Sequence, residues 1–169
     1  MAARFLDRTE VLTLALQCHS EGRFNDAEVI YRRLHDADCR DAEVIYLMGV
    51  LHCDLGLYES ACAFLKDALA LAPVFPEAQI QLVLALTALA DVNLSSGNLE
   101  QAQSFLEKAL DLAPRDPRVL TGFGRVALLR DNAGAAEVWL EAALAQRPDD
   151  AEALKLLGLA QLQLEKAPL

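Results

Sequence analysis

Two pairs of neighbouring residues could bind a metal ion. Cys18 precedes His19 and His52 precedes Cys53, the second pair standing 34 positions after the first (52 − 18 = 34). Thiolate sulfur and imidazole nitrogen are ligands that zinc prefers, and a structural site usually holds four of them. In a helix, however, adjacent side chains point about 100° apart and cannot both reach one ion. We therefore expect no metal and no cofactor, with Cys18 and His52 in a core and the other two residues facing outward.

Catalytic motifs are missing from the rest of the chain. The sequence has no glycine-rich phosphate loop, no nucleophile elbow and no H-E-x-x-H signature. Its acidic residues, such as Asp149 and Asp150, are typical of helix starts and solvated faces. The sequence therefore predicts a protein that is not an enzyme.

A pattern of small and large residues repeats along the chain. Alanines recur 34, 41 and 34 positions apart, each followed four positions later by a large side chain, and prolines and glycines keep step. Three residue types thus share one period of 34 and one insertion of seven (41 − 34 = 7). The members of the pattern are Ala27, Ala61, Ala102, Ala136, Pro73, Pro114, Pro148, Gly49, Gly124 and Gly158.

The amino-acid composition indicates that the repeated segments are helices. Hydrophobic residues make up 54% of the chain, mostly alanine and leucine, whereas the aromatic residues that favour strands make up 6%. Small residues let a partner helix approach closely, large residues at helical spacing fill the gaps, and proline ends the second helix. The sequence therefore predicts an all-α chain of helical hairpins, which must stack to bury their apolar sides.

The pattern resembles the tetratricopeptide repeat. That family repeats W-x-x-L-G-x-x-Y, then A-x-x-x-F, then P, over about 34 residues. The motif positions are filled by Met48-Gly49, Tyr58, Ala61, Leu65 and Pro73 in the second unit and by Phe123-Gly124, Ala136, Leu140 and Pro148 in the fourth. Other residues replace the consensus tryptophan throughout. The resemblance implies a right-handed α-solenoid of nine helices, a superhelix of tandem hairpins.

The resemblance also implies one domain over residues 1–169. Its repeats are expected at about 8–41, 42–75, 76–116 and 117–150, with a closing helix at 151–165. The seven-residue insertion falls near 76–82. Seven residues are two helical turns, which would lengthen that helix by about 10 Å without turning its apolar face. The insertion is either a tolerated extension or a protruding lip of a binding groove.

The first helices of successive hairpins line a concave groove in this family. The groove positions in this sequence are Leu12, Leu16, His19, Tyr46, Leu47, Val50, Leu84, Thr87, Ala88, Asp91, Arg118, Thr121, Arg125, Lys155 and Leu159. The N-terminal half of this set is apolar and aromatic, and the C-terminal half carries three basic residues. The resemblance thus implies that the partner is another protein, with an extended segment or amphipathic helix that has apolar anchors and an acidic end.

Alternatives remain for three leucines of this set. Leu12, Leu16 and Leu47 can instead pack beneath neighbouring side chains or against a second copy of the chain. Self-association agrees with a mean hydropathy of +0.21. The same leucines stand where the branch of the family that binds heat-shock-protein tails has the Lys and Asn of its carboxylate clamp. Binding of those tails is therefore not expected.

Charge and cysteine usage limit the partners and the compartment. A net charge of −10 and a pI near 4.7 disfavour binding to nucleic acids and anionic membranes. We find no N-terminal signal and no apolar stretch of the roughly 18 residues that span a bilayer, so membrane insertion is not expected. The four cysteines lack the spacing of a disulfide framework, which favours a reducing cytoplasm.

The function expected from these features is that of a non-catalytic scaffold or adaptor in a bacterial-type cytoplasm. One alternative is a small cytoplasmic chaperone, because the chain is similar in size and charge to the tetratricopeptide-built chaperones of type III secretion. Another is the recognition module of a larger enzyme such as a glycosyltransferase. An adaptor should be soluble alone, whereas a dedicated chaperone should co-purify with its client.

Overall fold

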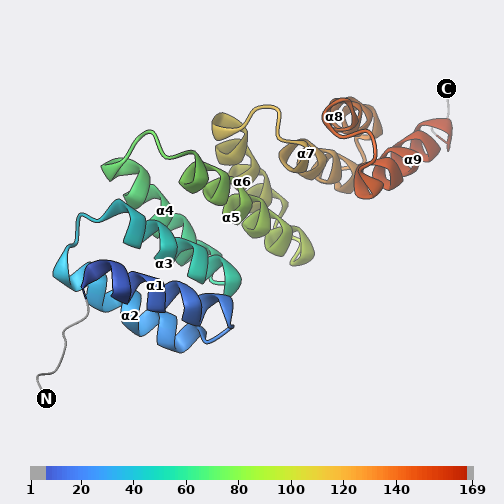
Figure 1. Cartoon of the computed structure of the whole chain (residues 1–169). Helices are drawn as coiled ribbons and strands as arrows, with labels where there is room; N and C mark the ends of the chain where they lie inside the picture. Colours follow the sequence, from blue (N-terminus) through green and yellow to red (C-terminus); the bar gives the residue numbers. More distant parts are fainter. Residues whose placement is uncertain (1–6, 167–169) are drawn as a thin grey trace, which may run out of the picture. The chain divides into compact units, whose positions relative to one another are not determined.

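A computed structural model describes residues 7–166 of the chain. This part of the chain forms helices joined by short turns and contains no strand, which confirms the all-α class and the helical hairpins (Figure 1). The helices are α1 (Arg8–Ser20), α2 (Phe24–Ala37), α3 (Ala42–Asp54), α4 (Tyr58–Leu71), α5 (Pro76–Ser95), α6 (Leu99–Leu112), α7 (Pro117–Leu129), α8 (Ala133–Gln146) and α9 (Ala151–Lys166).

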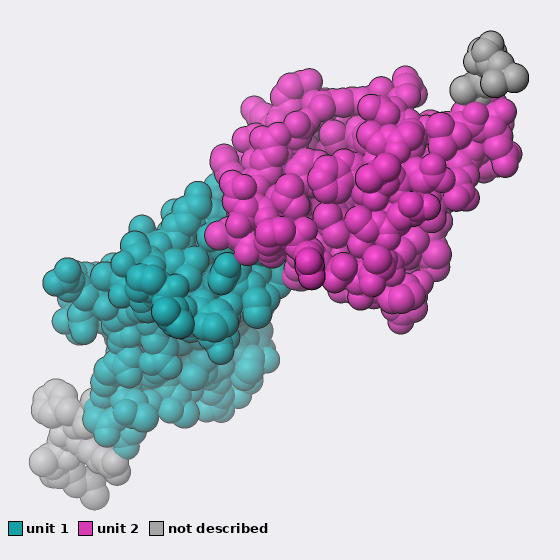
Figure 2. Space-filling model, turned by 90° about the horizontal axis from the view of Figure 1, so that it is seen from above, with its two compact units in different colours: residues 1–85 teal, residues 86–169 magenta. Residues whose placement is uncertain are grey.

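The chain divides into two compact units, Met1–Ala85 and Leu86–Leu169, coloured separately in Figure 2. In unit 1, α1 packs on α2, α2 on α3, and α3 on α4. In unit 2, α6 packs on α7, α7 on α8, and α8 on α9. The odd-numbered helices begin at residues 8, 42, 76, 117 and 151, where the sequence predicts that the repeats and the closing helix begin. The grouping into one domain stays a prediction.

Helix α5 is longer than the other first helices of the hairpins. It has 20 residues, whereas α1, α3 and α7 have 13 each, a difference of seven (20 − 13 = 7). Its most apolar 18-residue window has a mean hydropathy of 1.3, so by length and composition α5 could cross a membrane, contrary to the expectation from the sequence. The core helix of a soluble protein meets the same criteria, and 44% of this window is buried. The helix is therefore weak evidence for a membrane span.

Aspartates begin the first helices of the hairpins. The carboxylates of Asp7, Asp41, Asp116 and Asp150 each accept a hydrogen bond from a backbone N–H in the first turn of the next helix. Asp7 also forms a capping box with Glu10. Such caps satisfy N–H groups that have no partner inside the helix, and each contributes about 1 kcal/mol. They mark where the first, second and fourth repeats and the closing helix start.

The turn inside each hairpin needs one residue in the left-handed region. Gly22, Gly56 and Gly97 occupy it with φ angles of 74°, 73° and 77°. The corresponding residue of the last hairpin is Asp131, with φ 55°. Glycine adopts this conformation without steric cost, whereas a Cβ atom makes it unfavourable. Asp131 is therefore a strained member of an otherwise regular set.

Asp131→Gly is expected to raise the free energy of unfolding by roughly 0.5–1 kcal/mol, because it removes this strain. The check is the midpoint of urea unfolding followed by circular dichroism. Gly97→Ala, made at the corresponding turn, serves as the reverse control and should lower the midpoint. A lower midpoint for Asp131→Gly would contradict the assignment of backbone strain to Asp131.

Two glycines permit close helix approach, as the sequence predicts. A Cβ atom added to Gly49 would lie 2.7 Å from Cγ of Leu65, and one added to Gly124 would lie 2.6 Å from Cγ of Leu140. Both leucines are fully buried. Gly158 in α9 occupies the same position of the pattern, yet no described atom lies within 4 Å of an added Cβ. Of the three glycines of the pattern, only Gly49 and Gly124 are thus required by packing.

The core of each hairpin is built on the alanine–large-residue pairs of the pattern. Ala27 with Tyr31 in α2 and Ala136 with Leu140 in α8 are completely buried. Burial raises the pKa of Tyr31 to about 12. In unit 2, the ring of Trp139 stacks on Phe123 with the centroids 4.8 Å apart. These contacts hold each second helix against the first helix of its hairpin.

Candidate functional site

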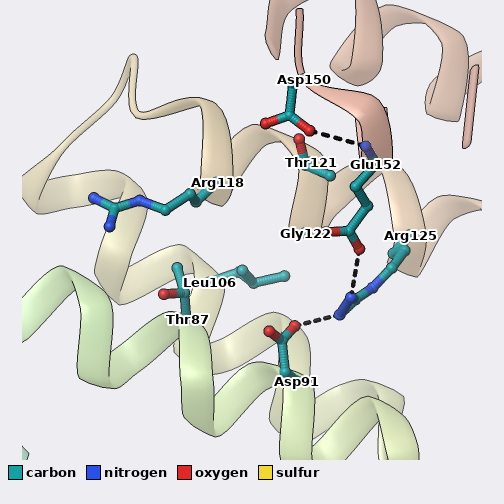
Figure 3. Close-up of a pocket in the computed structure, with 9 residues that line it drawn as sticks. All are labelled: Thr87, Asp91, Leu106, Arg118, Thr121, Gly122, Arg125, Asp150 and Glu152. Carbon is teal, nitrogen blue, oxygen red and sulfur yellow. Dashed lines mark hydrogen bonds and ion pairs between the residues drawn. The ribbon is translucent and has the colours of Figure 1, made fainter. Parts of the chain in front are cut away.

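A cavity of about 240 Å³ lies within unit 2 (Figure 3). It is surrounded by residues of α5, α6 and α7 and by the start of α9. The lining residues are Thr87, Asp91, Leu106, Arg118, Thr121, Gly122, Arg125, Asp150 and Glu152. They combine carboxylates, guanidinium groups and hydroxyls with the apolar side chain of Leu106, and such a set is suited to binding a polar group.

Part of the cavity wall has no room for a larger residue. A Cβ atom on Gly122 would lie 2.6 Å from Cδ2 of Leu106, so the missing side chain lets α7 approach α6 at this point. Next to it, Thr121 has only 6% of its surface exposed, and its hydroxyl has no hydrogen-bond partner among the described residues. A buried hydroxyl without a partner costs about 1–3 kcal/mol. A ligand that reached Thr121 would remove that cost.

Arg125 connects α7 to two other helices. Its Nη1 donates to Oε1 of Glu152 at 2.9 Å, and its Nη2 pairs with Oδ1 of Asp91 (Figure 3). Asp91 and Arg125 stand one repeat apart, 34 residues along the chain. Loss of hydration raises the pKa of Asp91, and the charge of Glu152 adds to this effect, while Arg125 opposes it without cancelling it. The guanidinium of Arg125 therefore pairs with the carboxylates of both Asp91 and Glu152.

Arg118 is held by the residue that caps its own helix. Its Nε and Nη2 donate to the two carboxylate oxygens of Asp116 at 3.0 and 2.6 Å. Burial alone would raise the pKa of Asp116, but the side-chain and backbone hydrogen bonds from Arg118 outweigh it, so that the pKa is lowered. The same pairing raises the pKa of Arg118. Both arginines of the cavity are thus already matched with carboxylates of the protein.

The charges at the cavity differ from the basic surface expected from the sequence. The lining includes three carboxylates against two guanidinium groups. Asp116 adds a fourth carboxylate behind Arg118, and Arg147 adds a third guanidinium group, whose Nη1 lies 3.1 Å from Oδ2 of Asp150. The sum is therefore −1 (three positive charges and four negative charges). Lys155, the third basic residue expected here, is exposed on α9 and does not line the cavity. An acidic ligand would meet a net negative site.

Two family models described as tetratricopeptide repeats match residues 40–115 and 93–162. The chain belongs to the tetratricopeptide repeat family. Proteins of this family are in general non-catalytic modules for protein–protein interaction, and we describe the chain as an interaction scaffold on that ground.

Solved structures of tetratricopeptide proteins share the fold. The MamA protein is 22% identical over 93% of this chain and 84% of its own, with a TM-score of 0.66. YrrB, described as a tetratricopeptide protein with an unusual peptide-binding site, is 19% identical over 94% and 78%, with a TM-score of 0.61. A thermophilic tetratricopeptide protein of Thermus thermophilus is 27% identical over 94% and 83%, with a TM-score of 0.51. No curated protein sequence matches the chain.

Five of the residues predicted from the tetratricopeptide pattern come together at the cavity. Thr87 and Asp91 approach it from α5, while Arg118, Thr121 and Arg125 approach it from α7. The structure thus brings together residues that are up to 38 positions apart (125 − 87 = 38). Whether a partner contacts them stays a prediction.

The leucines predicted for unit 1 lie in different environments. Leu12 is 7% exposed and belongs to a core cluster with Val44 and Met48, so the prediction that it faces the groove is wrong. The reason is that its side chain packs into this cluster instead of facing solvent. Leu47 is partly buried against the same cluster, whereas Leu16 is 42% exposed. The alternative of packing beneath neighbours therefore applies to Leu12 and, in part, to Leu47.

His19 has partners within unit 1. Its Nε2 lies 2.8 Å from Oδ2 of Asp54, and its Nδ1 lies 3.4 Å from the hydroxyl of Tyr31. The edge of its ring also contacts Phe24, with the centroids 5.8 Å apart. His19 is thus held in place by the hairpin rather than left free for a ligand.

Tyr46 and Val50 are half-buried on α3. The ring of Tyr46 lies 4.8 Å from that of Phe75, and burial raises the pKa of its hydroxyl. This aromatic pair is an apolar feature of unit 1 that remains partly accessible.

The two cysteine–histidine pairs agree with the sequence prediction only in part, because His19 and Cys53 are half-buried rather than turned fully outward. Cys18 and His52 are buried, and His52 packs edge-on against Phe64. Burial lowers the pKa of His52 and raises the pKa of Cys53 to about 11, so Cys53 is a thiol at neutral pH. Within residues 7–166, no three His, Cys, Asp or Glu side chains are grouped so that they could hold a metal ion.

Four lining residues are not predicted by the tetratricopeptide pattern: Leu106, Gly122, Asp150 and Glu152. Glu152 is the second residue of α9, as Arg118 is the second of α7, so the same positional rule could have found it. Gly122 has no side chain that a sequence pattern could assign to a ligand, and Asp150 has the position of a helix cap. Leu106 belongs to a second helix, which the rule does not consider.

Proposed function

We propose that this chain is an adaptor that binds a segment of another protein, and that the cavity of unit 2 is part of the binding surface. One observation carries the proposal. Residues that the tetratricopeptide pattern assigns to the partner-facing side surround a cavity in which the buried hydroxyl of Thr121 has no partner among the described residues. Such a hydroxyl favours a ligand that supplies the missing hydrogen bond.

The dimensions of the cavity favour an extended segment. A volume of about 240 Å³ can receive one long side chain, whereas a helix with its side chains is about 10–12 Å across. The segment would place one side chain in the cavity and lay its backbone along α5 and α7. YrrB, which shares the fold, is described as having a peptide-binding site, and this supports a peptide ligand by analogy.

Thr87→Tyr tests the proposal, because its larger side chain would fill the cavity. The partner is captured from native cells with the unchanged chain and identified by mass spectrometry. Its affinity is then measured by calorimetry for the unchanged chain, for Thr87→Tyr and for Val92→Tyr, an exposed position on the same helix outside the cavity. We expect at least a tenfold loss for Thr87→Tyr and none for Val92→Tyr. Equal affinities for all three proteins would reject the proposal.

We further propose that the protein acts in the cytoplasm. Cys18, Cys39 and Cys53 are free thiols in the described part of the chain, and Cys18 is buried. Free thiols are usual in a reducing compartment. Fractionation of native cells with an antibody to the chain would test this, and recovery in the periplasmic or secreted fraction would reject it.

A further inference from the structure

We infer that the cavity of unit 2 binds a basic side chain, arginine or lysine, of the partner segment. The inference rests on the proposed function and names the chemistry of its ligand. Three features carry it: the arrangement of Asp91 and Glu152 around Arg125, the unpartnered hydroxyl of Thr121, and the apolar wall at Leu106.

The carboxylates at the cavity are more accessible than the guanidinium between them. The side chains of Asp91 and Glu152 are 58% and 56% exposed, whereas that of Arg125 is 27% exposed. A ligand that approaches from solvent therefore meets the carboxylates first. Each carboxylate offers about four acceptor positions, and a single hydrogen bond from Arg125 leaves most of them unused. A second cation between the two carboxylates would balance their charge.

An acidic side chain fits the same cavity poorly. To pair with Arg125 it would have to lie beside Asp91 and Glu152, whose charges repel it. To pair with Arg118 it would have to compete with the two hydrogen bonds that Arg118 donates to Asp116. The net charge of −10 adds long-range repulsion of acidic segments and attraction of basic ones.

The remaining walls suit the rest of a long basic side chain. Its methylene stem would pack on Leu106 beside Gly122, where no Cβ intervenes. Its N–H groups would donate to the hydroxyl of Thr121 and to the carboxylates, and a guanidinium can engage a carboxylate with two bonds. The buried hydroxyl of Thr121 is independent of the acidic residues, and it is the second reason for expecting a ligand here.

Three short peptides test the inference with the intact chain: acetyl-Ala-Arg-Ala-amide, the same peptide with citrulline, and the same peptide with glutamate. Citrulline keeps the shape of arginine but has no charge. Binding is followed through the backbone amide NMR signals of Asp91, Thr121 and Glu152. We expect saturable shifts with the arginine peptide, at least a fivefold weaker response with citrulline, and none with glutamate. No saturable shift with the arginine peptide, or an equal response to citrulline, would overturn the inference.

A charge-neutralising variant provides a second arm. Asp91→Asn combined with Glu152→Gln leaves Arg125 without its carboxylates, so the preference should switch from the arginine peptide to the glutamate peptide by about tenfold. The matched control is Asp111→Asn combined with Glu141→Gln, which removes the same charge at exposed positions outside the cavity. This control should keep the original preference. An unchanged preference in the first variant would overturn the inference.

The Thr87→Tyr measurement and the arginine-peptide titration together distinguish failure of this inference from failure of the proposed function. If Thr87→Tyr abolishes binding of the captured partner while the arginine peptide gives no saturable shift, the binding surface stands and the charge assignment fails. If the arginine peptide binds while Thr87→Tyr leaves the partner's affinity unchanged, the cavity is a cation site and the proposed function fails.

Discussion

Leu12→Glu is expected to lower the free energy of unfolding of the chain by at least about 3 kcal/mol, because it places an unpaired carboxylate in an apolar core. Leu12 is 7% exposed and packs in the cluster that includes Ala15, Val44 and Met48. Leu16→Glu, one helical turn further along α1, should change the same quantity by less than about 0.5 kcal/mol, because Leu16 is 42% exposed.

Urea unfolding followed by circular dichroism measures both leucine variants. The expected result is a large drop in the midpoint for Leu12→Glu and little change for Leu16→Glu, with similar slopes. Equal, small changes would mean that Leu12 faces solvent, as the tetratricopeptide pattern predicts. The comparison also decides which substitution can test binding, since only a variant that folds reports on a partner.

Gly124→Ala and Gly158→Ala are expected to change stability in opposite directions. Alanine is better than glycine in a helix by about 1 kcal/mol. At Gly124, however, the added Cβ would lie 2.6 Å from Cγ of the buried Leu140, and overpacking of this kind costs about 1–3 kcal/mol. At Gly158 no described atom lies within 4 Å of the added Cβ. Gly124→Ala should therefore be destabilising overall, and Gly158→Ala stabilising by roughly 0.5–1 kcal/mol.

Thermal unfolding of the two glycine variants gives the measurement. The melting temperature should fall for Gly124→Ala and rise for Gly158→Ala, although the two glycines hold the same position of the repeat. Restoring space with Leu140→Val in the Gly124→Ala background should recover part of the loss, provided that the contact with Leu140 is the cause. A shift of both melting temperatures in one direction would contradict the packing account.

The sequence was sufficient for features that depend on local geometry. The helix starts at Arg8, Ala42, Pro76, Pro117 and Ala151 follow from residues adjacent in the chain, namely capping aspartates and prolines. The close approach at Gly49 and Gly124 follows from a small residue repeated at one position. The same reasoning was incomplete for Gly158, because the need for a glycine depends on a neighbouring helix that only the structure can supply.

The candidate site was predictable only in part. The tetratricopeptide pattern identified Thr87, Asp91, Arg118, Thr121 and Arg125, since each stands at a fixed position of a first helix. It could not give the sign of the local charge. That sign depends on the pairing of Arg125 with Asp91 and Glu152 and of Arg118 with Asp116, which are contacts set by side-chain rotamers. Leu12 was misplaced for a related reason, since the rule does not say which first-helix positions a neighbouring helix covers.

The aromatic residues of the chain give each unit its own optical reporter. The one tryptophan, Trp139, stacks on Phe123 in unit 2, while all three tyrosines, Tyr31, Tyr46 and Tyr58, belong to unit 1. Tryptophan emission therefore follows the opening of the C-terminal hairpins, and tyrosine absorbance follows the N-terminal ones, with no label attached. Recording both during one titration compares the unfolding of the two halves of the same molecule directly. Because the tryptophan and the three tyrosines are divided between the two units, the unlabelled native protein can report how cooperatively the units unfold.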